Sequence, residues 1–255
     1  DDGKKAEHGF VSMIPYEENY FISWLDGRNS VMENGEGHSE GHHGQMTIRG
    51  AVIDKQGNKS NEWELDNRVC DCCQTAATNT TNGPVVVYRD RSEQEIRDVS
   101  IVRLIDGKWT TPKPIFTDNW KIEGCPVNGP RIDAIGNSLA VAWFTSPDKN
   151  AQVNIVFSND GGATFNSPLR IDEGKGIGRV DVVMLDENTA VVSWMEGSVI
   201  KAVKAYSNGK KEASFTVAAS AESSGFPQMT KSGSNLFFAW TDDKTKTIKI
   251  ASFSL

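Results

Sequence analysis

The 255-residue chain has the length and composition of an ordinary globular protein built as one domain. Its 27 Lys and Arg residues are outnumbered by 34 Asp and Glu residues, which gives a formal net charge of −7. This acidic balance argues against nucleic acid and against anionic membrane surfaces as partners. No apolar run approaches the roughly 20 residues of a membrane-spanning helix.

Short β-branched and aromatic runs, separated by turn residues, predict strands along the whole chain. The runs fall into five groups, each with up to four strands: residues 10–66, 75–117, 130–172, 179–219 and 226–255. The last group lacks a fourth strand. No helical periodicity comes between the runs, so the pattern indicates an all-β protein with few helical residues.

One strand in each group carries nearly the same sequence, with small or β-branched residues followed by an aromatic residue. These aromatic anchors are Trp24, Tyr88, Trp143, Trp194 and Trp240. After a longer first interval, their spacing is close to the roughly 40–50 residues of a propeller blade. We therefore predict a β-propeller of four-stranded antiparallel blades that spans residues 1–255 as one domain, with the five groups as its blades.

The segment from Ser158 to Phe165 reads Ser-Asn-Asp-Gly-Gly-Ala-Thr-Phe. It resembles the Asp-box (Ser-x-Asp-x-Gly-x-Thr-Trp) of the sialidase, or BNR-repeat, β-propellers, with Phe165 in place of Trp. In that family the motif is structural and closes the hairpin between the third and fourth strands of a blade. The resemblance implies a propeller in an extracytoplasmic protein, whether secreted, periplasmic or at the cell surface. It does not by itself imply sialidase activity.

The number of blades has two interpretations. Sialidase-type propellers have six blades, and the resemblance therefore implies that an N-terminal blade and a closing strand are missing from this chain. The alternative is a five-bladed ring that residues 1–9 close. Either arrangement would protect the edges of the end sheets, which a propeller otherwise leaves open.

Antiparallel strands place alternate connections on the same face of a propeller. We call the top face the one that carries the loops between second and third strands and the links between blades. The unusual segments of the chain all belong to it, including three His residues in the loop of residues 34–45, the Cys70-Asp71-Cys72-Cys73 segment and Cys125. The top face is therefore the predicted functional face.

The cysteines and histidines predict either a metal site or a structural disulfide. Cys70 and Cys73 have CxxC spacing, and thiolates with imidazoles suit copper or zinc. The alternative is a disulfide between the links of adjacent blades, for example Cys73 to Cys125, with the histidines in a solvated loop. The candidate metal ligands are His8, His38, His42, His43, Cys70, Cys72, Cys73 and Cys125.

The resemblance also implies a glycosidase site, because sialidases hold a substrate carboxylate with three arginines and use a Tyr–Glu pair with an Asp acid/base. The candidate catalytic residues are Tyr88, Arg89, Arg97, Asp98, Arg131, Arg179 and Glu196, with Arg91 and Glu95 beside them. The family's arginine triad cannot be mapped, since Gly129-Pro130-Arg131 reverses the usual Arg-x-Pro order. The alternative is a set of ion pairs around the propeller mouth.

These observations favour a binding module with a His/Cys/Arg-rich site on the top face and copper or zinc as candidate metals. One alternative function is that of an exo-sialidase-like glycoside hydrolase acting on acidic glycans. Another is that of a scaffold subunit in a cell-surface assembly. The expected partner is a small molecule or glycan at the top face, or another protein.

Overall fold

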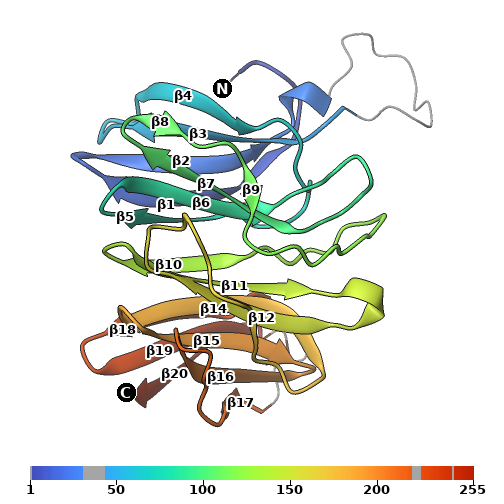
Figure 1. Ribbon diagram of the computed structural model, residues 1–255, viewed down its shortest axis with the longest axis vertical. Coiled ribbons are helices and arrows are strands. Elements are labelled where there is room, and N and C mark those ends of the chain that lie inside the picture. Colours follow the sequence, from blue (N-terminus) through green and yellow to red (C-terminus); the bar gives the residue numbers. More distant parts are fainter. Residues whose placement is uncertain (1, 31–43, 220–224, 243) are drawn as a thin grey trace.

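The computed structural model describes residues 2–30, 44–219, 225–242 and 244–255. Its strands form five antiparallel sheets that follow one another in chain order (Figure 1). The described residues contain two 3-10 turns, Arg28–Ser30 and Pro147–Lys149, and no α-helix. No helix in this part of the chain is therefore long and apolar enough to cross a membrane. The all-β prediction is confirmed.

The sheets have up to four strands each, with a fifth short strand in the second. The first sheet contains β1 (His8–Tyr16), β2 (Asn19–Asp26), β3 (Thr47–Ile53) and β4 (Lys59–Asp66). The second contains β5 (Ala76–Thr80), β6 (Gly83–Arg89), β7 (Val99–Ile105), β8 (Lys108–Trp109) and β9 (Lys113–Pro114), which pairs with β7. The third contains β10 (Arg131–Ile135), β11 (Ser138–Thr145), β12 (Gln152–Ser158) and β13 (Leu169–Arg170). The fourth contains β14 (Gly176–Asp186), β15 (Thr189–Glu196), β16 (Val199–Tyr206) and β17 (Phe215–Ala218), and the fifth contains β18 (Gln228–Ser232), β19 (Asn235–Asp242) and β20 (Thr247–Ser254).

Consecutive sheets pack face to face, from the first sheet at one end of Figure 1 to the fifth at the other. A sheet between two others buries both of its faces, which explains the continuous apolar runs in the second strands. Val85, Val86 and Val87 of β6 are all fully buried although their side chains alternate between the two faces.

The aromatic anchors of four sheets share one polar interaction. The rings of Tyr88, Trp143 and Trp194 are buried in the core, and each of the four anchors donates a hydrogen bond from its polar tip to a carboxylate at the top of the blade. The four pairs are Trp24 with Asp26 (2.8 Å), Tyr88 with Asp66 (2.7 Å), Trp143 with Asp118 (2.7 Å) and Trp194 with Glu196 (2.7 Å). The repeated sequence of the second strands therefore reflects a repeated structural bond.

The fourth strands of the second and third sheets are much shorter than the sequence predicts. The apolar and β-branched residues of 109–116 and 164–171 predict extended strands there, whereas β8, β9 and β13 have two residues each. In the third sheet the Asp-box turn is the reason, because Asp160 and Ser158 bind the amides of Thr164 and Gly162. These bonds hold the chain in a turn where the ladder would otherwise continue.

The two end sheets expose apolar side chains on the faces that turn away from their neighbours. Val11 and Met13 of β1 are 62% and 65% exposed, and Ile248 and Ile250 of β20 are 70% and 71% exposed. Residues 2–7 form no strand, so they do not complete the three-stranded fifth sheet. The number of blades and the closure of the ring stay predictions.

The Asp-box turn gives a pH-dependent prediction. Partial burial opposes ionisation of Asp160, but hydrogen bonds from Thr164 and Ser158 outweigh it and lower its pKa from 3.8 to about 2. The carboxylate therefore contributes stability above pH 4 that is lost as the pH falls toward 2. We expect the Asp160→Asn variant to lose less unfolding free energy than the wild type between pH 5 and pH 2, measured by urea denaturation. The matched control is Asp106→Asn in the exposed turn of the second sheet. The prediction would be contradicted if this variant reduced the pH-dependent loss of unfolding free energy as much as Asp160→Asn does.

Candidate functional site: a four-cysteine cluster on the top face

The link between the first and second sheets is held against the second sheet before it reaches its cysteines. Val69 forms an isolated β-bridge with Asp90, and the Cys70 amide donates to the Arg89 carbonyl at 3.0 Å. Arg89 is the last residue of β6, where the loop to β7 begins. The link and this loop therefore form one continuous backbone platform on the top face.

Four cysteine sulfurs meet on this platform. The Sγ atom of Cys70 lies 3.5 Å from that of Cys73 and 3.9 Å from that of Cys72. Cys72 forms a disulfide with Cys125, which comes from the link between the second and third sheets, and the two Cα atoms are 6.0 Å apart. Cys70 and Cys73 are free thiols and are almost completely buried. The cluster thus contains one disulfide beside a buried pair of thiols.

The disulfide joins the two links that were expected to meet, but its partner on the first link differs from the example drawn from the sequence. The sequence suggested Cys73 as the partner of Cys125, whereas the structure uses Cys72. Cys73 is buried beside Cys70, while Cys72 is partly exposed and Cys125 is exposed. The direction of the side chain, rather than the spacing, selects the partner.

The surroundings of the two free thiols shift their pKa values in opposite directions. Arg97, itself buried, donates from Nη1 to the Sγ atom of Cys70 at 3.2 Å, and the Sγ atoms of Cys70 and Cys73 are hydrogen-bonded to each other at 3.5 Å. The hydrogen bond with Cys73 lowers the pKa of Cys70 to about 6, with help from Arg97 and Arg89 and against the effect of burial. The same bond and burial raise the pKa of Cys73. Cys70 is therefore the more acidic thiol of the pair.

Three arginines surround the carboxylate of Glu95 beside the cluster. Arg97 Nη2 lies 2.6 Å from Oε2, Arg91 Nη2 lies 3.0 Å from Oε1, and Arg68 Nη2 lies 3.7 Å from Oε1. Although burial opposes it, the hydrogen bonds from Arg91 and Arg97 lower the pKa of Glu95 below its usual value. Glu95 has a φ of 62°, a left-handed conformation, at the tip of the loop between β6 and β7. The Glu95 carboxylate thus occupies Arg91 and Arg97, two of the arginines that the sequence suggested for binding a substrate carboxylate.

Arg89 and Asp98 have structural partners. The guanidinium of Arg89 is buried and donates to the carbonyls of Asn128 (2.9 Å), Arg97 (2.5 Å) and Phe144 (2.7 Å), and it lies over the Trp120 ring at 5.0 Å. Asp98 accepts hydrogen bonds from the backbone amides of Asn119 and Trp120. Both residues position the top-face loops.

Tyr88 and Glu196 also belong to the repeated anchor bonds. Tyr88 is fully buried and donates to Asp66, and burial raises the pKa of its phenol far above the usual value. Glu196 accepts hydrogen bonds from the Trp194 indole and from the amide of Glu173. A nucleophilic tyrosine needs access to a substrate, which this buried position does not provide.

Arg131 and Arg179 lie at the inner strands of the third and fourth sheets and reach toward the fifth. Arg131 donates to Gln228 at 3.2 Å and lies 4.0 Å from Asp181. Arg179 donates to the Gly225 carbonyl at 3.1 Å, and its guanidinium lies 5.7 Å from the centre of the Phe226 ring. These two arginines therefore connect blades and belong to no cluster with Arg97 in the described contacts.

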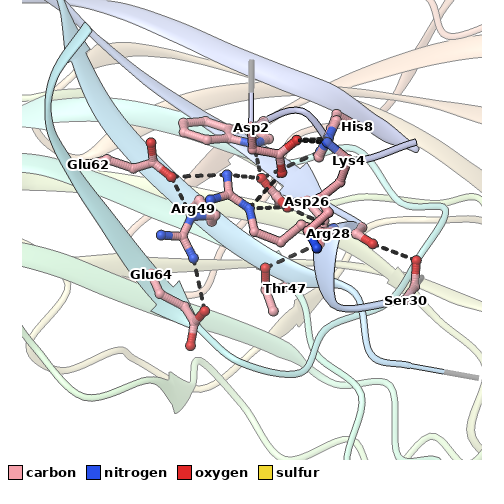
Figure 2. Close-up of polar contacts among 12 residues, drawn as sticks. Asp2, Lys4, His8, Asp26, Arg28, Ser30, Thr47, Arg49, Glu62 and Glu64 are labelled. Atoms are coloured by element: carbon pink, nitrogen blue, oxygen red, sulfur yellow. Dashed lines mark hydrogen bonds and ion pairs between the residues drawn. The ribbon is translucent and has the colours of Figure 1, made fainter. Parts of the chain in front are cut away.

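His8 belongs to a different group from the cysteines. Its ring nitrogens lie 3.6 Å from Asp2 and 3.5 Å from Asp26, and Figure 2 shows Arg28 between the same two carboxylates. Arg28 contacts Asp2 at 3.1 Å and Asp26 at 2.7 Å. The guanidinium already offsets part of the negative charge of these carboxylates, which disfavours a cation there. His38, His42 and His43 lie outside the described residues.

The sequence offered little signal for two members of these groups. Arg68 was not selected, although it lies two residues before Cys70 and in an extended link would point to the same side. Asp2, in the polar N-terminal segment, was also missed as a partner of His8.

Comparisons with known proteins support the fold. No protein-family model and no curated protein matches the chain. Among solved structures, a mutant of AofleA from Arthrobotrys oligospora has a TM-score of 0.57 at 11% identity, covering 96% of this chain and 72% of that one. The α-L-arabinofuranosidase PaAbf62A from Podospora anserina in complex with cellotriose has a TM-score of 0.51 at 10% identity, covering 100% and 92%. A mutant of Aleuria aurantia lectin in complex with Fucα1-6GlcNAc has a TM-score of 0.51 at 11% identity, covering 95% and 90%.

These likenesses concern the fold alone, since every identity is below 25%. The chain spans about half the length of two further matched structures, a Hadza microbial sialidase (52%) and a sucrose-6-phosphate hydrolase from Lactobacillus gasseri (51%). A propeller fold of the kind found in glycoside hydrolases is supported. Membership of the sialidase (BNR-repeat) propellers stays a prediction.

The Glu95 contacts give a stability prediction. Replacing Glu95 with Gln removes the negative charge that faces Arg91 and buried Arg97, and a hydrogen bond to a charged group is worth about 1.5–3 kcal/mol. We expect Glu95→Gln to lower the free energy of unfolding by about 1–3 kcal/mol, measured by denaturant titration at pH 7. The control is Glu93→Gln, an exposed residue of the same loop, which should change it little. Equal effects of the two substitutions would contradict the assigned role of Glu95.

Proposed function

We propose that this protein is a metal-binding propeller whose top-face site is the four-cysteine cluster, which takes copper or zinc when its sulfurs are reduced. The observation that carries the proposal is the convergence of Cys70, Cys72 and Cys73, whose sulfurs lie within 4.8 Å of one another, with Cys125 bonded to Cys72. Four thiolates form a ligand set that suits soft metal ions.

The distances among the sulfurs support this proposal. A zinc–sulfur bond of about 2.3 Å in tetrahedral geometry requires sulfurs roughly 3.8 Å apart. Cys70 is 3.5 Å from Cys73 and 3.9 Å from Cys72, so three sulfurs need little movement to share one ion. Reduction of the disulfide would supply the remaining thiolate from Cys125. Cu(I) binds the same soft ligands, so the metal analysis described below is needed to decide between zinc and copper.

The surrounding charge also favours an anionic metal–thiolate group. Arg97 donates to Cys70, and the buried guanidinium of Arg89 adds positive charge nearby. Such charges offset the excess negative charge that four thiolates bring to a divalent ion. The disulfide in the oxidised form is also consistent with an extracytoplasmic location, as disulfides persist in oxidising compartments.

A second candidate function is glycan binding at the top face, as a binding module or as a glycoside hydrolase. It is favoured by the likeness in fold to an arabinofuranosidase with cellotriose and to a lectin with a fucosylated disaccharide. A third, a scaffold subunit in a cell-surface assembly, is favoured by the exposed apolar side chains of the two end sheets. Within residues 2–30, 44–219, 225–242 and 244–255, neither has a converged set of side chains comparable to the cysteine cluster.

Metal analysis tests the proposal. The protein is reduced under anaerobic conditions, incubated with Zn(II) or Cu(I), freed of excess metal, and its metal content and thiol count are measured. We expect about one tightly held ion per chain for a four-thiolate site. The Cys70→Ser and Cys73→Ser variants should lose it. His8→Ala is the control, since His8 belongs to a separate group, and should keep it. Unchanged metal content in both cysteine variants would reject the proposal.

The buried tyrosine and the occupied arginines give a catalytic prediction. We expect no appreciable hydrolysis of an aryl sialoside, because Tyr88 is inaccessible and Arg91 and Arg97 are engaged by Glu95. The measurement is release of the aryl group at enzyme concentrations in the micromolar range. Turnover that disappears in Tyr88→Phe or Arg97→Ala but persists in Arg103→Ala, an arginine of β7 outside the top face, would overturn this expectation.

A further inference from the structure

The cluster places an accessible disulfide against a buried pair of thiols. Cys72 is partly exposed and its partner Cys125 is exposed, whereas Cys70 and Cys73 are only 1% and 2% exposed. Cys70 Sγ lies 3.9 Å from Cys72 Sγ and 3.5 Å from Cys73 Sγ. Cys70 is therefore close to both a disulfide sulfur and a second thiol. No other cysteine occurs in the chain.

We propose that the cluster is a thiol–disulfide exchange site that moves its disulfide from the accessible pair, Cys72–Cys125, to the buried pair, Cys70–Cys73. In the first step the Cys70 thiolate attacks Cys72 Sγ, the Cys70–Cys72 bond forms, and the Cys72–Cys125 bond breaks with Cys125 leaving as a thiolate. In the second step Cys73 attacks Cys70 Sγ, the Cys70–Cys73 bond forms and the Cys70–Cys72 bond breaks, and the proton of the Cys73 thiol passes to one of the two released sulfurs, Cys72 or Cys125. The number of disulfides is unchanged, so the exchange needs no external oxidant or reductant.

Arg97 positions the attacking sulfur. Its Nη1 donates to Cys70 Sγ at 3.2 Å, and its Nη2 is held by Glu95 at 2.6 Å. The guanidinium thus favours negative charge on Cys70, and Glu95 keeps the guanidinium in place.

The backbone around Cys125 allows this bond to break without unfolding the link. The Arg97 amide donates to the Trp120 carbonyl at 2.8 Å, and the Ile122 amide donates to the Glu95 carbonyl at 3.0 Å. On the other side, Gly129 donates to the Gln74 side chain at 3.2 Å. Exchange would therefore free only the short segment around Cys125, which would leave an accessible thiol where the disulfide had joined two blade links.

Trapping with a bulky maleimide tests the exchange in the folded, full-length chain. The protein is purified without reductant and kept with a metal chelator, so the result does not depend on metal binding. A polyethylene glycol maleimide reaches exposed Cys125 far more readily than buried Cys70 or Cys73. We expect time-dependent labelling of Cys125 and then Cys72, with a Cys70–Cys73 disulfide in the peptide map of the labelled protein.

Variants separate the two steps. Cys70→Ser should slow labelling of Cys125 at least about tenfold, because the attacking thiolate is gone. Cys73→Ser should still label Cys125 but retain a Cys70–Cys72 disulfide. Arg97→Gln should slow labelling, whereas Arg68→Gln, which contacts Glu95 but no sulfur, should not.

Two outcomes would overturn the inference. One is a wild-type chain whose Cys72–Cys125 disulfide stays intact, with Cys125 unlabelled, throughout the trapping period. The other is labelling of Cys125 at the same rate in Cys70→Ser as in the wild type. The first outcome is measured on the wild type alone, so this test remains valid even if a variant fails to fold. Exchange without metal uptake by the reduced protein would reject the proposed function and leave this inference standing.

Discussion

The buried guanidinium of Arg89 is the interaction on which the top face depends. It reaches three carbonyl groups, those of Asn128, Arg97 and Phe144, which lie on three different segments of the chain. A buried charge is costly unless it is hydrogen-bonded, so each of these segments is held where its carbonyl can meet the guanidinium. Arg89 therefore fixes three segments relative to one another: the link that carries Cys125, the loop that carries Glu95, and the end of β11. The Arg89 carbonyl extends the same arrangement to Cys70.

This arrangement determines which side chains of the top face are already hydrogen-bonded within the chain and which can still react or bind a ligand. The charged residues that a glycosidase would need are satisfied within the chain: Tyr88 by Asp66, Glu196 by Trp194, and Asp98 by two backbone amides. The thiols are different, because a sulfur forms only weak hydrogen bonds and remains available to a metal or to another sulfur. Arg97 joins the two groups, since it contacts both the Glu95 carboxylate and the Cys70 sulfur. The reactivity of the cluster is thus tied to the ion pairs beside it.

The fold supplies rigidity through repetition. Each of the first four sheets attaches the aromatic tip of its second strand to a carboxylate near the top face, and successive sheets share a continuous apolar core. The Asp-box turn closes the opposite end of the third sheet through the Asp160 carboxylate. Loops that leave such a framework at one end have well-defined starting points, which allows two distant links to meet at a disulfide.

The sequence alone determined most of the strands and their order, the aromatic anchors and the Asp-box turn, because each depends on side chains close together in the chain; the lengths of β8, β9 and β13 did not follow from it. It also placed Cys125 on the same face as Cys70–Cys73, since antiparallel connectivity alternates between the two ends of a sheet. Only the tertiary structure decided that Cys125 pairs with Cys72, that Arg68, Arg91 and Arg97 surround Glu95, and that His8 joins Asp2 and Asp26 instead of the cysteines. These outcomes depend on side-chain direction and on distances between segments that residue spacing does not specify, and a rotation of one side chain is enough to exchange one partner for another.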